Sequence, residues 1–182
     1  NIMSEAYLHG ATIGEITSAL TSSHKIEINI NPLKQKRASK DFENLRELSR
    51  NYKIKNGFFP NVFLANMGSI KDYKARADFS KGFFEIGGFE VFDPPSYTDI
   101  ENLTNDVLDS GTLIVTICST DDKYPELVPQ ITKAIKSKNE NIQIILAGYP
   151  KEQIEQHKKS GVDDFIFLGA DAMKILTSLY NK

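Results

Sequence analysis

The second part of the chain, from Asn61 onward, alternates apolar strand-like runs with amphipathic helical stretches. The five strand-like runs are NVFLAN, FEVFD, TLIVTIC, IQIILAG and DFIFLG, and a helical stretch follows each of them. Strands that are mostly apolar and separated by helices form parallel sheets covered on both faces. With right-handed crossovers, the pattern predicts a doubly wound, flavodoxin-like α/β domain with a five-stranded parallel sheet in the order 2-1-3-4-5.

The stretch after the first strand-like run carries helix signals at both ends. Ser69, followed three residues later by Asp72, resembles a capping box with a shorter acid than usual. Gly87 and Gly88 can supply the left-handed residue that ends a helix. Between these ends, the spacing of the apolar residues predicts one buried face, formed by Ala75, Phe79, Phe83 and Ile86.

The other helices also begin at recognisable signals. The second is expected to begin at Thr98, with Glu101 in the capping relation. Proline is common at the first helical position, so Pro125 and Pro150 mark the starts of the third and fourth helices. The last helix, within residues 170–182, is expected to bury a stripe at helical spacing: Met173, Leu176, and Leu179 or Tyr180.

Residues 1–60 do not follow this alternation and are expected to form a helical arm or linker, separate from the α/β domain of residues 61–182. Helices are predicted over 11–20 and 40–52, and the second should pack on the α/β domain or a partner. Its packing residues are expected to be Phe42, Leu45 and Leu48. A solvated arm explains the basic cluster better than an anion site does: Lys34, Lys36, Arg37 and Lys40. The chain starts at Asn1, so we expect a fragment of a longer protein.

Composition narrows the classes of function. The formal net charge is -2, so neither nucleic acid nor a membrane surface is an expected partner. No apolar run approaches the ~18 residues that span a bilayer, and no signal peptide is recognisable, so the cytoplasm is the expected compartment.

Cys118 lies in a β-branched run and is expected to be a buried thiol, not a nucleophile. His157, in EQHKKSG, is expected on a solvated helix face.

The loops after the strands are where chemistry is expected, because ligands of open α/β sheets bind beyond the carboxyl ends of the strands. A phosphorelay receiver needs acids after its first strand, where Asn66 stands here. Asp121 and Asp122, beyond the third run, are expected to cap the next helix. Gly68 stands alone, without the rest of a dinucleotide fingerprint. We therefore predict no catalytic, cofactor-binding or metal-binding residues in this chain.

The run VFLANMGSIKDYKARADFSKGFFEIGGFEV closely resembles the C-terminal, cobalamin-binding domain of the methylmalonyl-CoA mutase family, in particular that of its small, non-catalytic subunit. The resemblance continues through TICSTDDKYPELVPQI, IQIILAGYP and GVDDFIFLGADAMKIL, and so covers about residues 61–180. Residues 30–52 resemble the segment that joins this domain to the family's (β/α)8 barrel. Residues 1–23 resemble the end of that barrel domain.

In the family's catalytic subunits, the first loop carries Asp-x-His-x-x-Gly, whose His coordinates cobalt while the Asp orients its ring. Those three places are occupied here by Ile70, Asp72 and Ala75. Ile70 accepts no hydrogen bond, and Asp72 at a helix N-terminus is stabilised as a cap, so neither supplies an oriented imidazole. The resemblance also implies a slot for the nucleotide tail of cobalamin, which Ala75 narrows and Tyr149, after Gly148, fills with bulk.

The resemblance implies the C-terminal part of the non-catalytic small subunit of a heterodimeric methylmalonyl-CoA mutase. Such a complex is an isomerase that interconverts methylmalonyl-CoA and succinyl-CoA. This chain would have a degenerate cobalamin site, bind no cofactor, and serve as scaffold and interface. Adenosylcobalamin and the acyl-CoA would be held by the homologous large catalytic subunit, which is the expected partner. Two alternatives stay open: an active homologue with a complete motif, against which the three replacements argue, and a free-standing flavodoxin-like sensor or adaptor domain.

Overall fold

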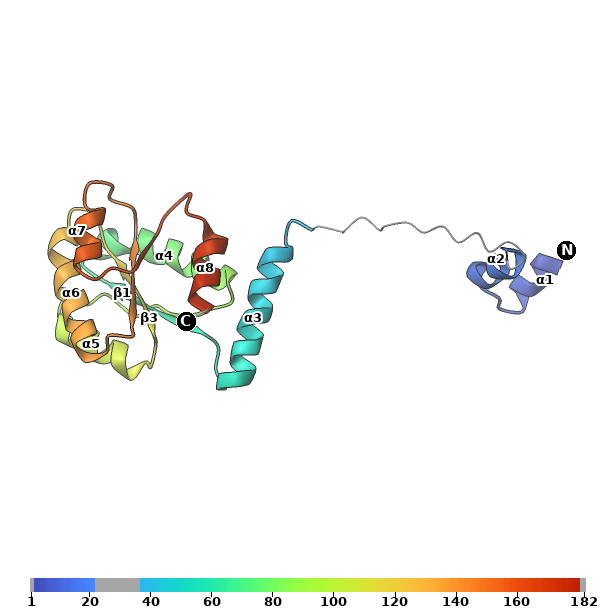
Figure 1. Cartoon of the computed structure of the whole chain (residues 1–182), viewed down its shortest axis with the longest axis horizontal. Helices are drawn as coiled ribbons and strands as arrows, with labels where there is room; N and C mark the ends of the chain where they lie inside the picture. The colour runs from blue at the N-terminus through green and yellow to red at the C-terminus, as the bar shows by residue number, and fades with distance from the viewer. Residues whose placement is uncertain (1, 22–36, 181–182) are drawn as a thin grey trace. The chain divides into compact units, whose positions relative to one another are not determined.

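The computed structural model describes residues 2–21 and 37–180, and the chain forms two compact units, residues 1–36 and 37–182. The second unit contains a five-stranded sheet and the helices α3 to α8 (Figure 1). None of the described helices combines the length and the apolar character that crossing a bilayer requires. The domain boundary predicted between residues 60 and 61 stays a prediction.

The sheet confirms the predicted fold class and strand order. All its strands are parallel, in the order β2-β1-β3-β4-β5. Nearly every side chain of β1, β3 and β4 is buried, which explains why these strands are apolar on both faces. The strands are β1 Asn61–Asn66, β2 Glu90–Phe92, β3 Ile114–Cys118, β4 Gln143–Ala147 and β5 Asp164–Ile166.

Helices cover both faces of the sheet, as Figure 1 shows: α5, α6 and α7 lie on one face, and α4 and α8 on the other. Successive side chains of a strand point to opposite faces, so the sheet feeds two cores. Phe63 and Ala65 pack beneath α5 and α6, whereas Val62 and Leu64 pack beneath α4 and α8. The helices are α3 Lys40–Asn56, α4 Ile70–Ile86, α5 Ile100–Asp109, α6 Tyr124–Lys138, α7 Ile154–Lys159 and α8 Ala172–Tyr180.

Helix α4 starts as predicted, whereas α5 does not. The backbone N–H of Ser69 donates to Oδ2 of Asp72 at 2.7 Å, which confirms the capping relation. Gly88, with a φ of 85°, supplies the left-handed residue after the helix. The predicted start of α5 at Thr98 is wrong, because Asp99 is the cap. The Asp99 carboxylate accepts hydrogen bonds from two backbone N–H groups of the first turn, at 3.1 and 3.4 Å.

The later helices show the same mixture of outcomes. Pro125 lies in the first turn of α6, as predicted. Pro150 does not begin α7, because a turn follows it and the helix starts at Ile154. In α8, Leu176 is fully buried as predicted, and Ile175 beside it is buried too. The other predicted residues of that stripe are only partly buried: Met173, Leu179 and Tyr180.

The buried face of α4 differs from the predicted one. Ala75 is exposed and Ile86 is half exposed, so the predicted face is wrong at both ends. The residues that are buried are Ala77, Ser80, Phe83 and Phe84. Ser80 is polar but satisfied, because its hydroxyl donates to the carbonyl oxygen of Arg76 at 2.7 Å. Because one residue of the buried face is a serine, the spacing of the apolar residues alone did not identify that face.

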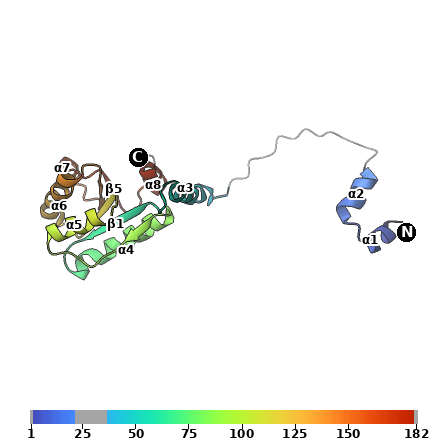
Figure 2. The ribbon, with the colours of Figure 1, turned by 90° about the horizontal axis from the view of Figure 1, so that it is seen from below.

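Helix α3 packs beside α8 (Figure 2), which confirms that this helix docks on the α/β domain. Leu45 is 1% exposed, and Phe42 packs against the same core. Leu48 was predicted to pack as well, but it is 41% exposed. Ser49 is buried instead, at 2% exposed, and its hydroxyl donates to the carbonyl oxygen of Gly88 at 2.6 Å.

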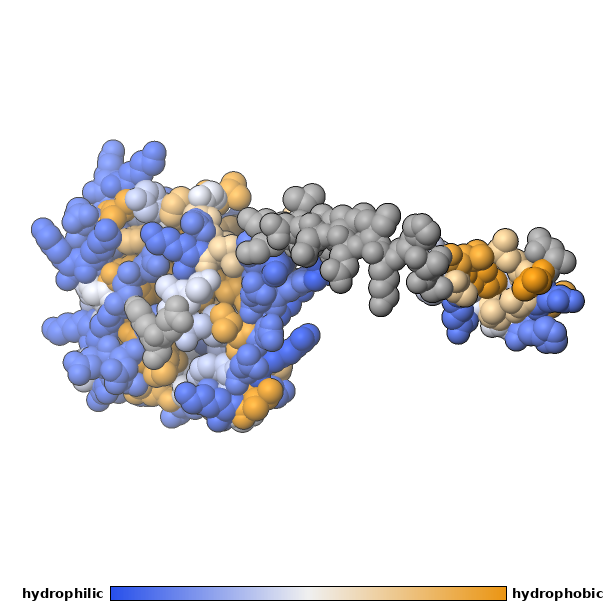
Figure 3. All heavy atoms as spheres, turned by 45° about the vertical axis from the view of Figure 1, so that its right-hand side comes forward, coloured by the Kyte–Doolittle hydropathy of each residue, from blue (hydrophilic) through white to orange (hydrophobic). Residues whose placement is uncertain are grey.

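The first unit contains α1, Ile2–Leu8, and α2, Ile13–Thr21, and neither helix has a buried residue. Figure 3 shows apolar surface over these helices, where Leu8 is 83% and Ile13 is 74% exposed. Helices this short are marginal in water by themselves. Residues 30–36, the first part of the segment that resembles the family's joining segment, lie outside the described residues. So do two members of the basic cluster, Lys34 and Lys36.

Candidate functional site

The strand order reverses between β1 and β3, and ligands of this fold class bind at such a switch point. The loop of residues 67–69 leads from β1 into α4, and the loop of residues 119–123 leads from β3 into α6. A hydrogen bond joins the two loops: the Ser119 hydroxyl donates to the carbonyl oxygen of Met67 at 3.1 Å. We call the residues of these two loops and of the first turns of α4 and α6 the switch-point cluster.

An ion pair also spans the switch point. Nζ of Lys123 lies 2.5 Å from Oδ2 of Asp72, and the Ser69 hydroxyl donates to the same oxygen at 2.7 Å. The hydrogen bond from Lys123, followed by those from Ser69, lowers the pKa of Asp72 to about 2. Gly68 has a φ of 93°, and a Cβ there would lie 2.8 Å from Asp72 Oδ2. Asp72 is therefore a charged cap, as predicted, that also joins the two loops.

Tyr124 ties the end of β3 to the end of β4. It is the first residue of α6, and its side chain is fully buried. Its hydroxyl donates to the carbonyl oxygen of Ala147 at 2.6 Å and accepts a hydrogen bond from the backbone N–H of Ser119 at 3.1 Å. Burial raises the pKa of Tyr124 above its ordinary value, so the hydroxyl stays protonated and able to donate.

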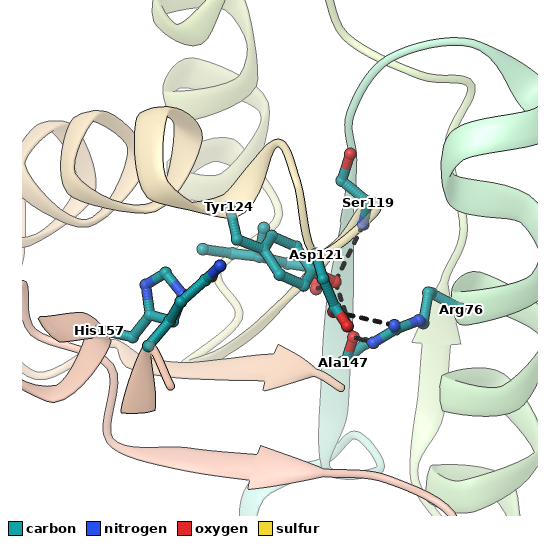
Figure 4. A network of polar contacts seen from close by, with 8 residues as sticks. Arg76, Ser119, Asp121, Tyr124, Ala147 and His157 are labelled. Atoms are coloured by element: carbon teal, nitrogen blue, oxygen red, sulfur yellow. Dashed lines mark hydrogen bonds and ion pairs between the residues drawn. The ribbon is translucent and has the colours of Figure 1, made fainter. Parts of the chain in front are cut away.

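Arg76 reaches from α4 across the carboxyl ends of β3 and β4, as Figure 4 shows. Its guanidinium donates to the carbonyl oxygen of Ala147 and pairs with Asp121 at 2.9 Å. It also lies 5.9 Å from the centre of the Tyr124 ring. A Cβ on Gly148 would overlap the guanidinium, and the φ of 138° at Gly148 is itself unsuited to a side chain. The space beside Gly148 is thus filled by Arg76.

His157 does not lie on a solvated helix face, so that prediction is wrong. Its side chain is fully buried behind Tyr124, with the two rings edge to face and their centres 6.1 Å apart (Figure 4). Nε2 lies 3.1 Å from Oε1 of Gln153, and Nδ1 has no partner among the described residues. Burial lowers the pKa of His157, although the charge of Asp121 partly opposes this. The lysines that follow His157 in the sequence are typical of an exposed helix face, and so they gave no indication that the His157 side chain is buried.

We expect the buried His157 to make the protein sensitive to mild acid. Because its pKa is lowered in the folded state, the unfolded chain takes up the proton first, and stability falls as the pH drops below the ordinary histidine value. The melting temperature should decrease as the pH is lowered from about 7.5 to about 5.5. The decrease should be smaller in His157→Leu. The matched control is His9→Gln, at an exposed histidine of the first unit. Equal pH slopes for all three proteins would refute this role for His157.

The remaining candidates from the sequence have structural positions. Cys118 is fully buried, as predicted, and burial raises the pKa of its thiol to about 12. The expected capping role of Asp121 and Asp122 is wrong, because Lys123 is the N-cap of α6 and no side chain among the described residues caps that helix. The Asp121 carboxylate pairs with Arg76 instead. Tyr149 stacks on Phe167 with ring centres 4.4 Å apart, and so it packs near β5. The bulk beside Gly148 therefore comes from Arg76.

The end of β1 is also joined to the loop after β2. Asn66, at the end of β1, is fully buried, and its amide donates to Asp93 and to the carbonyl oxygen of Pro94, both at 2.8 Å. Within residues 2–21 and 37–180, no three His, Cys, Asp or Glu side chains are placed to hold a metal ion. The contacts join the loops after β1, β2, β3 and β4 into one network.

Curated proteins similar in sequence to this chain are small subunits of methylmalonyl-CoA mutase. The chain matches no family model. It is 30% identical to the methylmalonyl-CoA mutase small subunit of Streptomyces virginiae over 146 residues, which cover 80% of the chain and 22% of that protein. It is 27% identical to the small subunit of Porphyromonas gingivalis over 154 residues, which cover 85% of the chain and 24% of that protein. The chain thus spans less than a quarter of the length of these curated relatives.

Solved structures bear on the fold alone. A cobalamin-binding protein from Desulfitobacterium hafniense superposes with a TM-score of 0.50 at 16% identity, covering 92% of this chain and 76% of that one. A CheY-like protein from Pseudomonas aeruginosa superposes with a TM-score of 0.52 at 15% identity, covering 68% of this chain and 92% of that one. Both similarities support a flavodoxin-like α/β fold.

Proposed function

Because the chain is a homologue of methylmalonyl-CoA mutase small subunits, we propose that it is part of such a subunit and acts as a non-catalytic scaffold with a degenerate cobalamin site. The mutase would be a heterodimer that isomerises methylmalonyl-CoA and succinyl-CoA. Adenosylcobalamin would be bound by the homologous large subunit and not by this chain. The observation that carries the proposal is the guanidinium of Arg76, which fills the space beside Gly148.

The residues at the switch point do not fit cobalt ligation. The place of the ligating imidazole is held by Asp72, whose carboxylate is committed to Lys123 and Ser69. Ile70, in place of the orienting acid, is 68% exposed and can accept no hydrogen bond. Cobalt prefers a neutral nitrogen ligand held by an acceptor on its other ring nitrogen. Both members of that pair are replaced here.

The space for the nucleotide tail supports the same proposal. By the family resemblance, the tail would pass close to Gly148. Arg76 occupies that place and is held there by Ala147 and Asp121. Ala75, expected to narrow the slot, is exposed on α4 instead. A tail entering this space would have to displace a guanidinium that has a carboxylate partner 2.9 Å away.

We expect restoration of the ligand alone to fail. Asp72→His should show no coordination of hydroxocobalamin, because the ring lacks an orienting acid and Arg76 still fills the slot. A missing orienting partner typically lowers metal affinity by ~10 to 100-fold. The triple variant Ile70→Asp, Asp72→His, Arg76→Ala should gain a weak, saturable absorbance change. The matched control replaces Arg76 by Lys in the same triple variant, which restores a cation and should lower the gain. Equal coordination by Asp72→His and the triple variant would contradict the role of Arg76.

Co-expression tests the subunit proposal. A homologous large subunit with an intact Asp-x-His-x-x-Gly motif is expressed with the tagged small subunit, of which this chain is a part, and the mixture is separated by size exclusion. The proposal predicts one complex of equal stoichiometry, with cobalamin absorbance that is lost when the large-subunit His is replaced. Elution of the small subunit alone would instead favour a free-standing adaptor. Cobalamin retained by the small subunit in the absence of its partner would contradict the degenerate site.

A further inference from the structure

A groove of about 550 Å³ runs along the outer edge of β5, between α7 and α8. Its apolar floor includes Phe165 and Phe167, with Ile154 on the α7 side and Ile175 on the α8 side. Leu168, the residue after Phe167, is 92% exposed. None of the residues that line this groove belongs to the switch-point cluster. Phe165 and Ile175 are at most 9% exposed, so the apolar surface that the groove shows to water comes from its partly buried members, Ile154 and Phe167.

The rim of the groove carries charges of both signs. Lys158 of α7 and Lys174 of α8 line it together with Asp164 and Asp171. Among the described residues, Lys174 has no carboxylate within 4.0 Å, and Lys158 only reaches Glu155 at 3.8 Å. The carboxylates each accept one backbone hydrogen bond, at 2.8 and 3.0 Å, which leaves an oxygen of each open to a further partner. Two ammonium groups and two carboxylates therefore share one rim.

The edge strand itself is protected against strand addition. The Asp164 carboxylate that lines the groove accepts the hydrogen bond of the Phe165 backbone N–H, and β5 has only three residues. A charged side chain folded onto a short edge strand is a common way to prevent pairing with another chain. Contact across this groove must therefore be made by side chains.

We propose that the groove beside β5 is a self-association surface, on which a second copy of the chain docks about a two-fold axis. Such an interface uses the same patch on both copies, so the patch must carry both partners of every interaction. This rim meets that condition in composition, because it carries two lysines and two aspartates, and in the proposed pairing the lysines of one copy meet the aspartates of the other. A partner of one charge sign would leave half of the rim facing like charges. The proposal goes beyond the scaffold role and does not depend on it.

The test uses the full chain without any large subunit and measures its mass by light scattering after size exclusion, from about 1 to 300 µM. We expect a shift from the monomer of 20.4 kDa toward twice that mass as the concentration rises. Two charge variants test whether the rim residues form the interface. The acidic variant is Lys158→Asp with Lys174→Asp, and the basic variant is Asp164→Lys with Asp171→Lys. Each should be monomeric alone, and their equimolar mixture should return the dimer.

Controls separate the interface from the fold. Lys159→Asp changes a charge of α7 outside the groove and should leave association unchanged. Leu168→Glu should weaken association roughly tenfold or more, because it brings a charge next to the apolar centre. If the basic variant does not fold, the acidic variant and Leu168→Glu decide, because both leave the backbone hydrogen bonds intact. A monomer at every concentration, or a dimer that persists in these variants, overturns the proposal and leaves the scaffold role untouched.

Discussion

Gly148→Ala is expected to lower the free energy of unfolding by about 2 to 5 kcal/mol, since backbone strain and a steric overlap act together. The φ of 138° disfavours any Cβ, and the new methyl group would overlap the guanidinium of Arg76. In an Arg76→Ala background the overlap disappears and the strain stays. The same glycine substitution should then cost less by about 1 to 2 kcal/mol. Urea unfolding of the four proteins of this double-mutant cycle measures the difference.

Gly169→Ala is the matched control for that cycle. Gly169 also has a positive φ, 97°, but no atom lies within 4 Å of the Cβ position. Its replacement should cost only the backbone strain, about 1 to 3 kcal/mol, and equally with Arg76 or Ala at position 76. If Gly148→Ala proved as costly without Arg76 as with it, Arg76 would not be what fills the space beside Gly148.

Leu45→Ala is expected to destabilise the second unit by about 2 to 5 kcal/mol, because a fully buried leucine is replaced by a cavity between α3 and the rest of the core. Leu48→Ala changes the same residue type one turn further along α3, at a position that is 41% exposed. It should cost well under ~1 kcal/mol. Comparable losses for both leucines, measured by thermal unfolding, would mean that α3 does not dock through the Leu45 face.

The sheet was predictable from the sequence, and the reason is local. Each central strand is a continuous apolar run between breakers, so strand positions and the parallel order follow from patterns that a single sequence displays. The starts of helices were less predictable. Thr98 and Asp99 are adjacent capping residues, and only the backbone conformation at Asp99 shows which of them caps α5. Turn chemistry leaves such shifts of one or a few residues open.

The site was predictable only in part, because its contacts join residues that are far apart in the sequence. The capping role of Asp72 is local and was predicted, whereas its ion pair with Lys123 spans 51 residues. The path of Arg76 to Ala147 spans 71 residues. One signal was present: Gly148 stands beside the slot that the family resemblance assigns to the nucleotide tail of cobalamin. It could have prompted a search for a side chain that fills the space beside it.

Buried polar residues explain the other errors. On α4, the buried Ser80 and the partly exposed Arg76 lie on the side that faces the ends of the strands, so the apolar residues alone pointed to a shifted stripe. His157 is enclosed although its sequence neighbours are charged. In each case the burial depends on partners from other elements, such as Tyr124 above His157. The hydropathy of a single sequence window does not indicate which residues of other elements will cover a side chain.

Equilibrium dialysis of the unmodified chain against cobalamin tests the central claim most directly, because it detects binding with or without coordination of the metal. Adenosylcobalamin and hydroxocobalamin are dialysed separately against the purified chain, with an Arg76→Ala variant in parallel. The scaffold account predicts equal cofactor concentrations on both sides of the membrane for the unmodified chain, because Asp72 is committed to Lys123 and Arg76 fills the space beside Gly148. A saturable excess on the protein side, approaching one cobalamin per chain, would contradict it.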